Sequence, residues 1–273
     1  MVLFLIVFFY IVIMNKYYTI TRAACRNVFL SLLGTLAKPA PGVHILNAHR
    51  LLDECESMNR FERILDYLSE CSKLVSIDYA IHLIIEHAQP SEPIIAFTFD
   101  DGFMECYTHF APALDKYGIK GLFFINPNYV NGDNGYIEFF NSQAVLTPNK
   151  TPMRWSHIKE LQHRGHIIGA HTMDHYMIND TNIDTLDYQI GYCRSVIEEK
   201  LEQSCDYFAF PYGRLEHANP ISIDIACQYY KYIFSQSDYK HYFSYDGRVI
   251  NRRHFEPFWP ISHIKYFLSC KKS

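Results

Sequence analysis

Apolar and polar residues alternate along this chain in blocks that predict strands and helices in regular succession from residue 43 onward. Short unbroken apolar runs, such as Ile94-Ile95-Ala96-Phe97-Thr98-Phe99, have the length and residue types of buried strands. Apolar residues spaced three and four apart, as in 185–201, are typical of amphipathic helices. The predicted strands are 43–46, 94–99, 121–125, 166–170, 207–210 and 232–234, and the predicted helices are 59–68, 77–87, 104–117, 155–164, 185–201, 220–230 and 260–268.

This alternation predicts an α/β fold with a parallel sheet. Parallel strands need crossover connections, so six or seven repeats of strand and helix favour a barrel with its site at the carboxyl ends of the strands. The longest stretch without a predicted element is 126–152, which is rich in Asn, Gly and Pro. We expect it to form a loop over the cleft and to influence specificity.

The chain begins with an uninterrupted apolar run, MVLFLIVFFYIVIM. As a helix of about 1.5 Å per residue it would reach roughly 21 Å, which is short of a hydrocarbon core of about 30 Å. The first cations, Lys16, Arg22 and Arg26, follow the run and would hold that side in the cytoplasm. Three interpretations stay open: a short membrane anchor, a true start at Met14, and a cleaved signal peptide.

The expected organisation follows from these segments. Residues 1–14 are the apolar segment, 15–42 an amphipathic basic segment with a Pro-rich linker, and 43–271 the α/β domain. We expect association with the cell membrane through the N-terminus, on a side that the sequence does not fix. If translation starts at Met14, a cytoplasmic protein is the alternative.

Composition narrows the class of protein. Lys plus Arg number 25 and Asp plus Glu 29, which gives a net charge of −4. Proteins that bind nucleic acid through phosphate contacts carry the opposite balance, so we expect no nucleic-acid partner. The eight cysteines are scattered without a Cys-x-x-Cys pair, which excludes a zinc ribbon or a thioredoxin motif.

Two clusters that follow predicted strands carry metal-binding chemistry. The first is Thr98-Phe99-Asp100-Asp101-Gly102. Adjacent carboxylates leaving a buried strand are costly unless a cation neutralises them, and one can bind a metal while its neighbour faces the substrate. The second is His171-Thr172-Met173-Asp174-His175. A helical turn there would place both imidazoles on one face.

A third cluster, Phe208-Ala209-Phe210-Pro211-Tyr212-Gly213-Arg214, also ends a predicted strand. Pro211 and Gly213 favour a tight turn, and such a turn can direct a backbone N–H into a cleft to hold an oxyanion.

Taken in this order, the three clusters resemble the polysaccharide deacetylase family, the NodB-homology domain of carbohydrate esterase family 4. The resemblance covers roughly residues 43–270. Asn47-Ala48-His49-Arg50 is similar to the Tyr-His-Arg end of the family's first strand, and Trp155-Ser156-His157-Ile158 to the helix before its second motif. The resemblance implies a distorted (β/α)7 barrel of the NodB-homology type, as a single domain.

The resemblance also implies a set of site residues. Asp101, His171 and His175 match the ligands of one divalent metal ion, usually zinc and sometimes cobalt or another divalent ion. Asp100 matches the catalytic base, and Tyr212 the residue whose backbone N–H binds the oxyanion.

Two positions depart from the family pattern. Many members have an arginine that pairs with the catalytic Asp, and Ala209 stands in its place. The family's general acid is a histidine near the C-terminus, for which His254 is the candidate and His49 the competitor. Arg252 or Arg253 could instead orient the base.

We therefore expect a metal-dependent hydrolase that removes N-acetyl groups from amino sugars of a polysaccharide or glycolipid. One alternative is a deformylase or other C–N amidase acting on a lipid-linked or small sugar. The other is a membrane-tethered glycan-binding protein with an inactive site, against which the intact Asp-Asp and His-x-x-x-His motifs argue.

Overall fold

The computed structural model of the protein describes residues 25–52 and 54–272. The apolar segment 1–14 and most of the amphipathic segment therefore lie outside the described residues. The described residues divide into two compact units, one of residues 25–40 and 259–270 and the other containing residues 41–52, 54–258 and 271–272. The larger unit contains all of the strands and all of the predicted site residues.

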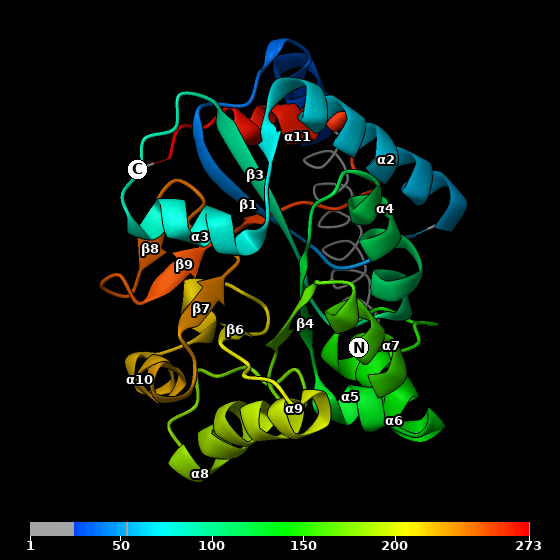
Figure 1. The fold of residues 1–273 in the computed structure, drawn as a ribbon, viewed down its shortest axis with the longest axis vertical. Coiled ribbons are helices and arrows are strands. Elements are labelled where there is room, and N and C mark those ends of the chain that lie inside the picture. Colours follow the sequence, from blue (N-terminus) through cyan, green and yellow to red (C-terminus); the bar gives the residue numbers. More distant parts are fainter. Residues whose placement is uncertain (1–24, 53, 273) are drawn as a thin grey trace, which may run out of the picture. The chain divides into compact units, whose positions relative to one another are not determined.

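The strands form a curled sheet whose order is β10-β1-β3-β4-β5-β6-β7-β9-β8, with β2 paired to β3 (Figure 1). All pairs are parallel except β8 with β9. This arrangement confirms the expected barrel-like α/β fold. The strands are β1 (Gly42–Ala48), β2 (Lys73–Leu74), β3 (Pro93–Phe99), β4 (Leu122–Ile125), β5 (Ile167–Ala170), β6 (Tyr207–Ala209), β7 (Tyr232–Ser235), β8 (Phe243–Ser244), β9 (Val249–Asn251) and β10 (Arg253–His254).

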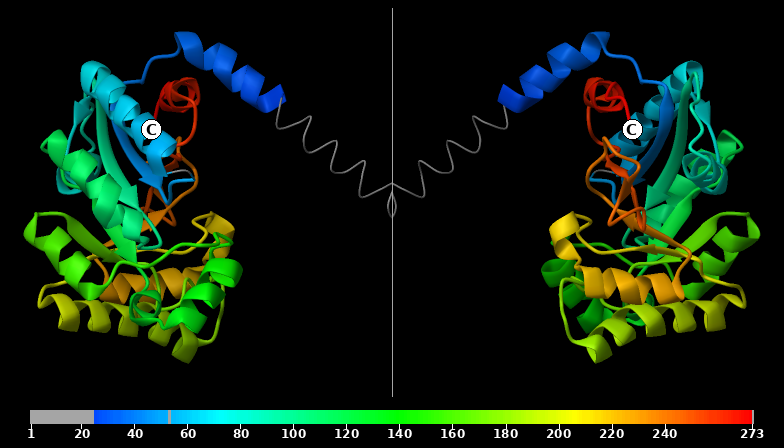
Figure 2. Two further views of the ribbon diagram at one scale, coloured as in Figure 1. Left: turned by 90° about the vertical axis from the view of Figure 1, so that its right-hand side faces the viewer. Right: turned by 90° about the vertical axis from the view of Figure 1, so that its left-hand side faces the viewer.

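Apart from α3, which packs against the inner side of the curl, helices of the larger unit lie around the outside of the curled sheet (Figures 1 and 2). They are α2 (Glu54–Cys71), α3 (Ile77–Ile85), α4 (Ala111–Lys116), α5 (Pro127–Asn131), α6 (Asn134–Phe139), α7 (Trp155–His163), α8 (Ile183–Leu186), α9 (Cys193–Leu201) and α10 (Pro220–Tyr229). The helix predicted over 185–201 is α8 and α9 joined by a wider, π-helical stretch, Asp187–Tyr192. The smaller unit contains a helix over 25–36 and α11 (Ile261–Leu268).

The segment 126–152 differs from its prediction as a loop, because much of it is helical. Pro127 occupies the first turn of α5, where a missing N–H costs nothing. The Asp133 side chain caps α6 by accepting a hydrogen bond from the Tyr136 N–H at 2.8 Å. Asn, Pro and Gly residues therefore lie at or near the ends of these short helices and do not prevent them from forming.

The core lies on both faces of the sheet. Side chains of β1, β3, β4, β6, β7 and β9 form one buried cluster with four residues of α3, so α3 packs against the inside of the curl. Phe97 and Phe99 of β3 alternate with those inward residues and pack against Phe61 of α2 instead. Alternation along each strand thus supplies an inner and an outer core.

The last strands join the two edges of the curl. β9 pairs with β7, and β10, only one residue further, pairs with β1. Arg252 is the residue between them, and its side chain is fully buried. The buried, positively charged side chain of Arg252 therefore lies where β9 and β10 close the barrel against β1, a place called here the barrel seam.

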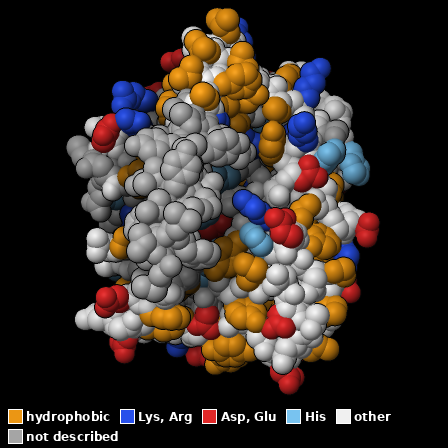
Figure 3. Space-filling model, turned by 180° about the vertical axis from the view of Figure 1, so that it is seen from behind, with side chains coloured by type: hydrophobic (Ala, Val, Ile, Leu, Met, Phe, Trp, Pro, Cys, Tyr) orange, Lys and Arg blue, Asp and Glu red, His pale blue; other side chains and the backbone are white. Residues whose placement is uncertain are grey.

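Among the helices that the structure describes, none is both long and apolar enough to cross a bilayer. On the face seen in Figure 3, Lys and Arg side chains are interspersed with Asp and Glu.

Candidate active site

The paired aspartates leave the carboxyl end of β3 in a tight turn. Asp100 and Asp101 are both buried. Asp101 and Gly102 adopt left-handed backbone conformations, with φ of 69° and 66°. A side chain at Gly102 would be strained by this φ and would meet Ile125 at 3.1 Å. The turn therefore sends the two adjacent carboxylates in different directions, and the left-handed Asp101 is a strained conformation of the kind found at functional sites.

Asp100 is held by an arginine from the barrel seam. Arg252 Nη1 donates to Asp100 Oδ1 at 2.8 Å and Nη2 to Oδ2 at 3.0 Å, while Asn47 Nδ2 donates to Oδ2 at 3.0 Å. Burial by itself would raise the pKa of Asp100, but the charge and hydrogen bonds of Arg252 bring it well below its usual range. Asp100 is thus an ionised, oriented carboxylate.

This contact also explains the departure at Ala209. Arg252 supplies the cation beside the Asp100 carboxylate, so an arginine at position 209 is not needed for that purpose. Arg253, the other arginine considered from the sequence, stacks on the Tyr239 ring with its guanidinium carbon 3.6 Å from the ring centre.

Asp101, His171 and His175 converge on one point. Asp101 Oδ1 lies 3.6 Å from His171 Nε2 and 3.4 Å from His175 Nε2. The histidines follow β5, but Thr172 and His175 have left-handed φ of 62° and 57°, so an irregular turn and not the expected helical turn brings the imidazoles together. Asn126 fixes this turn by donating from its side chain to the carbonyls of His171 and Thr172.

The donor atoms of this trio fit a divalent metal ion. The ring contact between His171 Nδ1 and the Ala209 carbonyl, at 2.7 Å, places the proton on Nδ1 and leaves Nε2 free to bind a metal. Asp101 Oδ1 is buried and accepts no hydrogen bond from the part of the chain that the structure describes. Two imidazoles and a carboxylate are the donor set of many catalytic zinc sites.

The pKa shifts agree with this assignment. Burial raises the pKa of Asp101 to about 7 and lowers that of His171 to about 4. Burial also places the pKa of His175 well below its usual range. Neutral imidazoles are the form that binds metal, and a cation would compensate the buried Asp101 carboxylate.

Both aspartates and both histidines line a hollow of about 230 Å³. Tyr212, whose φ is 61°, forms part of its wall, and its ring packs edge-on to His175 with centroids 4.7 Å apart. The Tyr212 hydroxyl donates to the Ala144 carbonyl at 3.2 Å. The remaining lining residues are His49, Ala144, Val145, Leu146, Gly213 and Gln236, so the segment predicted to cover the cleft contributes to it.

A second group of titratable residues lies beside Asp100. His49 Nδ1 is 2.9 Å from Glu256 Oε1, and His49 Nε2 is 3.8 Å from Asp100 Oδ2. Burial would lower the pKa of His49, but the Glu256 carboxylate outweighs it and raises that pKa to about 9. His254 contacts Gln236 through Nδ1 at 2.7 Å and does not line the hollow, and burial lowers its pKa to about 4.

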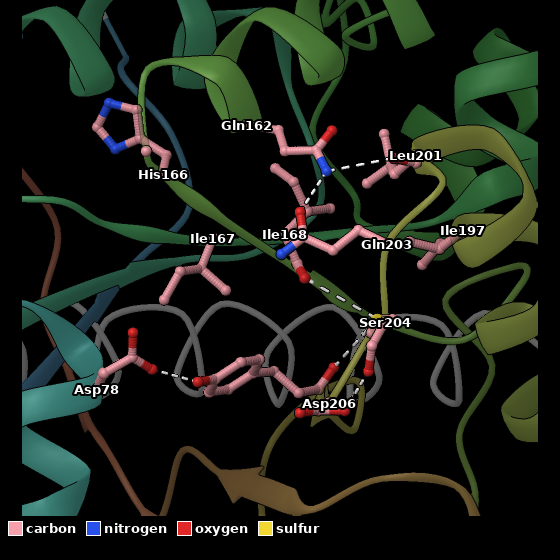
Figure 4. Close-up of a pocket in the computed structure, with 13 residues that line it drawn as sticks. Asp78, Gln162, His166, Ile167, Ile168, Ile197, Leu201, Gln203, Ser204 and Asp206 are labelled. Atoms are coloured by element: carbon pink, nitrogen blue, oxygen red, sulfur yellow. Dashed lines mark hydrogen bonds between the residues drawn. The ribbon is translucent and has the colours of Figure 1, made fainter.

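A different hollow, of about 310 Å³, lies at the opposite ends of β5 and β6 (Figure 4). Its single imidazole, His166, accepts a hydrogen bond from the Gly121 N–H at 3.1 Å, and its Asp78 pairs with Tyr207. It lacks the paired carboxylates and the second histidine found at the carboxyl ends. Its greater volume therefore does not make it the better candidate for chemistry.

The fold and the order of the motifs are those of the NodB-homology type, and the comparisons with known proteins agree. The family described as Polysaccharide deacetylase matches residues 87–228, just over half of the chain. The chain belongs to the polysaccharide deacetylase family. This confirms the resemblance inferred from the motifs and the expected class of enzyme, a hydrolase.

Individual relatives are distant. The chain is 23% identical over 132 residues to YxkH of Bacillus subtilis (strain 168), named as a polysaccharide deacetylase, which spans 48% of this chain and 41% of the relative. The chain thus spans less than half the length of the curated relatives it matches.

Solved structures show the same fold. IcaB from Ammonifex degensii superposes with a TM-score of 0.68 at 21% identity, covering 85% of this chain and 99% of that one. The deacetylase PplD of Streptococcus pyogenes, in complex with acetate, gives 0.60 at 16% identity, covering 83% and 97%.

The structure brings together Asp100, Asp101, His171, His175 and Tyr212, as the motifs predicted. Glu256 was missed, since a lone glutamate in the sequence carries no signal of its role. Gln236 was also missed, for the same reason. The sequence offered both Arg252 and Arg253 as residues that could orient Asp100, and the structure shows that Arg252 makes this contact.

Proposed function

We propose that this protein is a metal-dependent hydrolase that removes N-acetyl groups from amino sugars of a polysaccharide or glycolipid. The observation that carries the proposal is one hollow in which an ionised, oriented carboxylate, Asp100, faces the donor trio Asp101, His171 and His175. An amide hydrolase needs a base to deprotonate water and an electrophile to polarise the carbonyl. Asp100 would be the base, and the donor trio would hold a metal ion as the electrophile.

A divalent ion held by Asp101, His171 and His175, zinc being the first choice and cobalt an alternative, would supply Lewis acidity for the acetamide carbonyl and the attacking water. Asp100 would accept the proton of that water at Oδ1, which accepts one hydrogen bond, from Arg252, whereas Oδ2 accepts from both Arg252 and Asn47. Arg252 keeps Asp100 ionised and fixes its direction, so it acts as a positioning residue.

The oxyanion would be held by the Tyr212 backbone. The left-handed φ of 61° at Tyr212 directs this stretch of backbone along the wall of the hollow, beside His175. No described group accepts a hydrogen bond from the Tyr212 N–H, which leaves it available for an oxygen that becomes negative in the transition state.

The leaving amine must gain a proton, and two histidines compete for this role. His49 lines the hollow, lies 3.8 Å from Asp100 and holds a proton through Glu256. His254 is adjacent to His49, with ring centroids 5.2 Å apart, but is not part of the lining. We therefore assign the general acid to His49 and retain His254 as the alternative.

The decisive experiment is product release from N-acetylglucosamine oligomers and lipid-linked amino sugars, with and without a chelator. We expect acetate release that a chelator abolishes and that zinc or cobalt restores. Formate release from an N-formyl sugar, without acetate, would instead identify a deformylase. Glycan binding without either product would favour an inactive binding protein.

We further propose that the protein associates with the surface of the cell membrane. The helix over 25–36 exposes a row of large apolar side chains that recur with helical spacing on one face. They are Val28 (60% exposed), Phe29 (54%), Leu32 (69%), Leu33 (47%) and Leu36 (88%). The apolar run of residues 1–14 and the cations Arg22 and Arg26 precede or adjoin this face, a combination suited to anionic lipid.

Sedimentation with vesicles that contain anionic phospholipid tests this second proposal. Binding should fall in a Leu32→Glu, Leu36→Glu variant and persist in Ile183→Glu, which changes an apolar side chain of similar exposure in the larger unit. Equal binding by all three proteins would contradict the assignment of the membrane contact to this helix.

A further inference from the structure

A second cluster in the larger unit has the donor atoms of a metal site and is not used as one in the proposed reaction. One nitrogen from His49, one from His254 and a carboxylate oxygen of Glu256 all lie within 4.8 Å of one another. Glu256 Oε1 is 2.9 Å from His49 Nδ1 and 3.7 Å from His254 Nε2. We propose that this cluster is a second, weaker zinc site, and that zinc bound there inhibits the enzyme.

The distances support zinc in particular. Zinc bonds of about 2.0–2.1 Å in a tetrahedral site place neighbouring ligand atoms about 3.3 Å apart. The two distances from Glu256 Oε1, 2.9 and 3.7 Å, lie on either side of that value. Two imidazoles and a carboxylate are also the donor set of the Asp101 trio, so one metal suits both clusters.

The surroundings of the cluster orient its donors. The Gln236 side-chain amide lies 3.2 Å from His49 Nε2 and 2.7 Å from His254 Nδ1, the ring nitrogens other than those that approach Glu256. With its oxygen turned toward them, this amide accepts their N–H protons when the nitrogens facing Glu256 bind the metal. Glu256 Oε2 accepts from the backbone N–H groups of His49 and Arg50 at 3.4 and 3.5 Å. Such outer contacts fix the directions of imidazoles and carboxylates around a metal.

The cluster is also accessible to an ion from solution. The side chains of His49 and His254 are 21% and 36% exposed, whereas that of Glu256 is 8% exposed. Zinc would replace the proton shared by His49 and Glu256, and that proton would pass to the buffer. Because a proton already occupies the position, the second ion should bind more weakly than the ion at Asp101, whose oxygen accepts no hydrogen bond from the described residues.

Zinc titration of the full chain, by equilibrium dialysis and calorimetry, tests the inference. We expect two ions per chain at saturation, with the second bound at least about tenfold more weakly. His254→Gln and Glu256→Gln should each reduce the count to one, and His171→Ala with His175→Ala should remove the tighter ion while leaving the weaker one. His163→Gln, at an exposed position on α7, is the matched control and should retain both.

Two results would overturn the inference: a single ion in the wild-type chain at saturating zinc, or a second ion that survives in both His254→Gln and Glu256→Gln. Circular dichroism of each variant distinguishes lost binding from lost folding, and two independent variants guard against the failure of one. These counts do not depend on turnover.

The inhibitory effect, by contrast, rests on the proposed function, since it requires His49 to be the acid. Turnover should rise as the first site fills and then fall by about tenfold or more as the second site fills. Two bound ions at saturation, with no acetate release at any zinc concentration, would refute the proposed function while leaving the second site intact. Two bound ions without inhibition of an active enzyme would refute the inhibitory role.

Discussion

Two clusters, each of two histidines and one acid, lie on either side of Asp100, and their environments differ. In the Asp101, His171 and His175 trio the side chains are 2–7% exposed, and Asp101 Oδ1 accepts no hydrogen bond from the described residues. In the His49, His254 and Glu256 trio the exposure is 8–36%, and Glu256 is already paired with His49. The donor sets are similar, but the Asp101, His171 and His175 trio favours a metal cation, whereas the His49, His254 and Glu256 trio already holds a proton.

The two aspartates repeat this contrast at adjacent positions. Both are buried, and burial alone raises the pKa of each carboxyl. Arg252 reverses the effect at Asp100, whereas Asp101 has no such partner and its pKa stays at about 7. The two neighbouring aspartates therefore have different properties. Arg252 compensates the negative charge of Asp100, whereas a bound metal ion would be needed to compensate that of Asp101.

The largest expected effect breaks the first trio. In His171→Ala with His175→Ala, the tightly bound metal should be lost and turnover should fall on the order of 10³-fold, because Lewis-acid assistance contributes several kcal/mol. Metal analysis and acetate release measure the two effects. His163→Gln combined with His82→Gln alters two exposed histidines outside both clusters and should change neither. An unaltered metal content in the double alanine variant would refute the ligand assignment.

The next effect separates the two aspartates. Asp100→Asn should retain the metal and lose about 10²-fold or more in turnover, as expected for the loss of a general base. Asp101→Asn should weaken metal binding itself. Metal content and turnover measured on both variants sharpen the contrast, and a metal-free Asp100→Asn protein would show that the two roles are exchanged.

A smaller effect concerns the proton held by the second trio. The pKa of His49 is raised to about 9, above a value near 6.5 in the unfolded chain. The contribution of this proton to the free energy of unfolding is therefore complete below pH about 6.5 and is lost as the pH rises through about 9. It amounts to at most about 3.4 kcal/mol.

Thermal denaturation of the metal-free protein between pH 6 and 10 provides the measurement, since a bound ion would alter this pKa. His49→Gln should be less stable than wild type at the acid end of the range, and the difference should shrink toward the alkaline end. A difference that is independent of pH would mean that His49 does not hold this proton.

The smallest expected effect is at the N-terminus. Neither trio includes a residue from 1–14, and this run contains no His, Cys, Asp, Glu, Lys or Arg. A protein that begins at Met14 should fold, bind metal and hydrolyse a soluble substrate at a rate near that of the full chain. It should be slower on a lipid-linked substrate if tethering raises the local concentration. Loss of turnover on a soluble substrate, with metal bound, would place the segment within the catalytic domain.

Much of the metal trio could be predicted from the sequence, because its signals are local. Asp100 and Asp101 follow an apolar run of strand length, and His171 and His175 follow another. The carboxyl ends of parallel strands share one edge of a sheet, so residues that follow different strands meet there. The fold class followed from the same alternation of apolar runs, and the predicted parallel sheet was confirmed by the parallel pairing of β3 with β4 and of β4 with β5.

The sequence was less informative where local chemistry permits several structures. Segment 126–152 was predicted as a loop from its Asn, Gly and Pro content, yet it forms α5 and α6. The same residues that break long helices also begin and end short ones, so composition alone does not separate these cases.

By itself, then, the sequence determined the spacing of the motifs, and with it the residues available for a metal. Only the tertiary structure decided which charged partners they contact, and with them their pKa values. Arg252 reaches Asp100 across 152 positions and Glu256 reaches His49 across 207, both because β9 and β10 join the last part of the barrel to β1. Contacts made by closing a sheet on itself leave no periodic or local signal in the chain, since their partners become neighbours only when the edges meet.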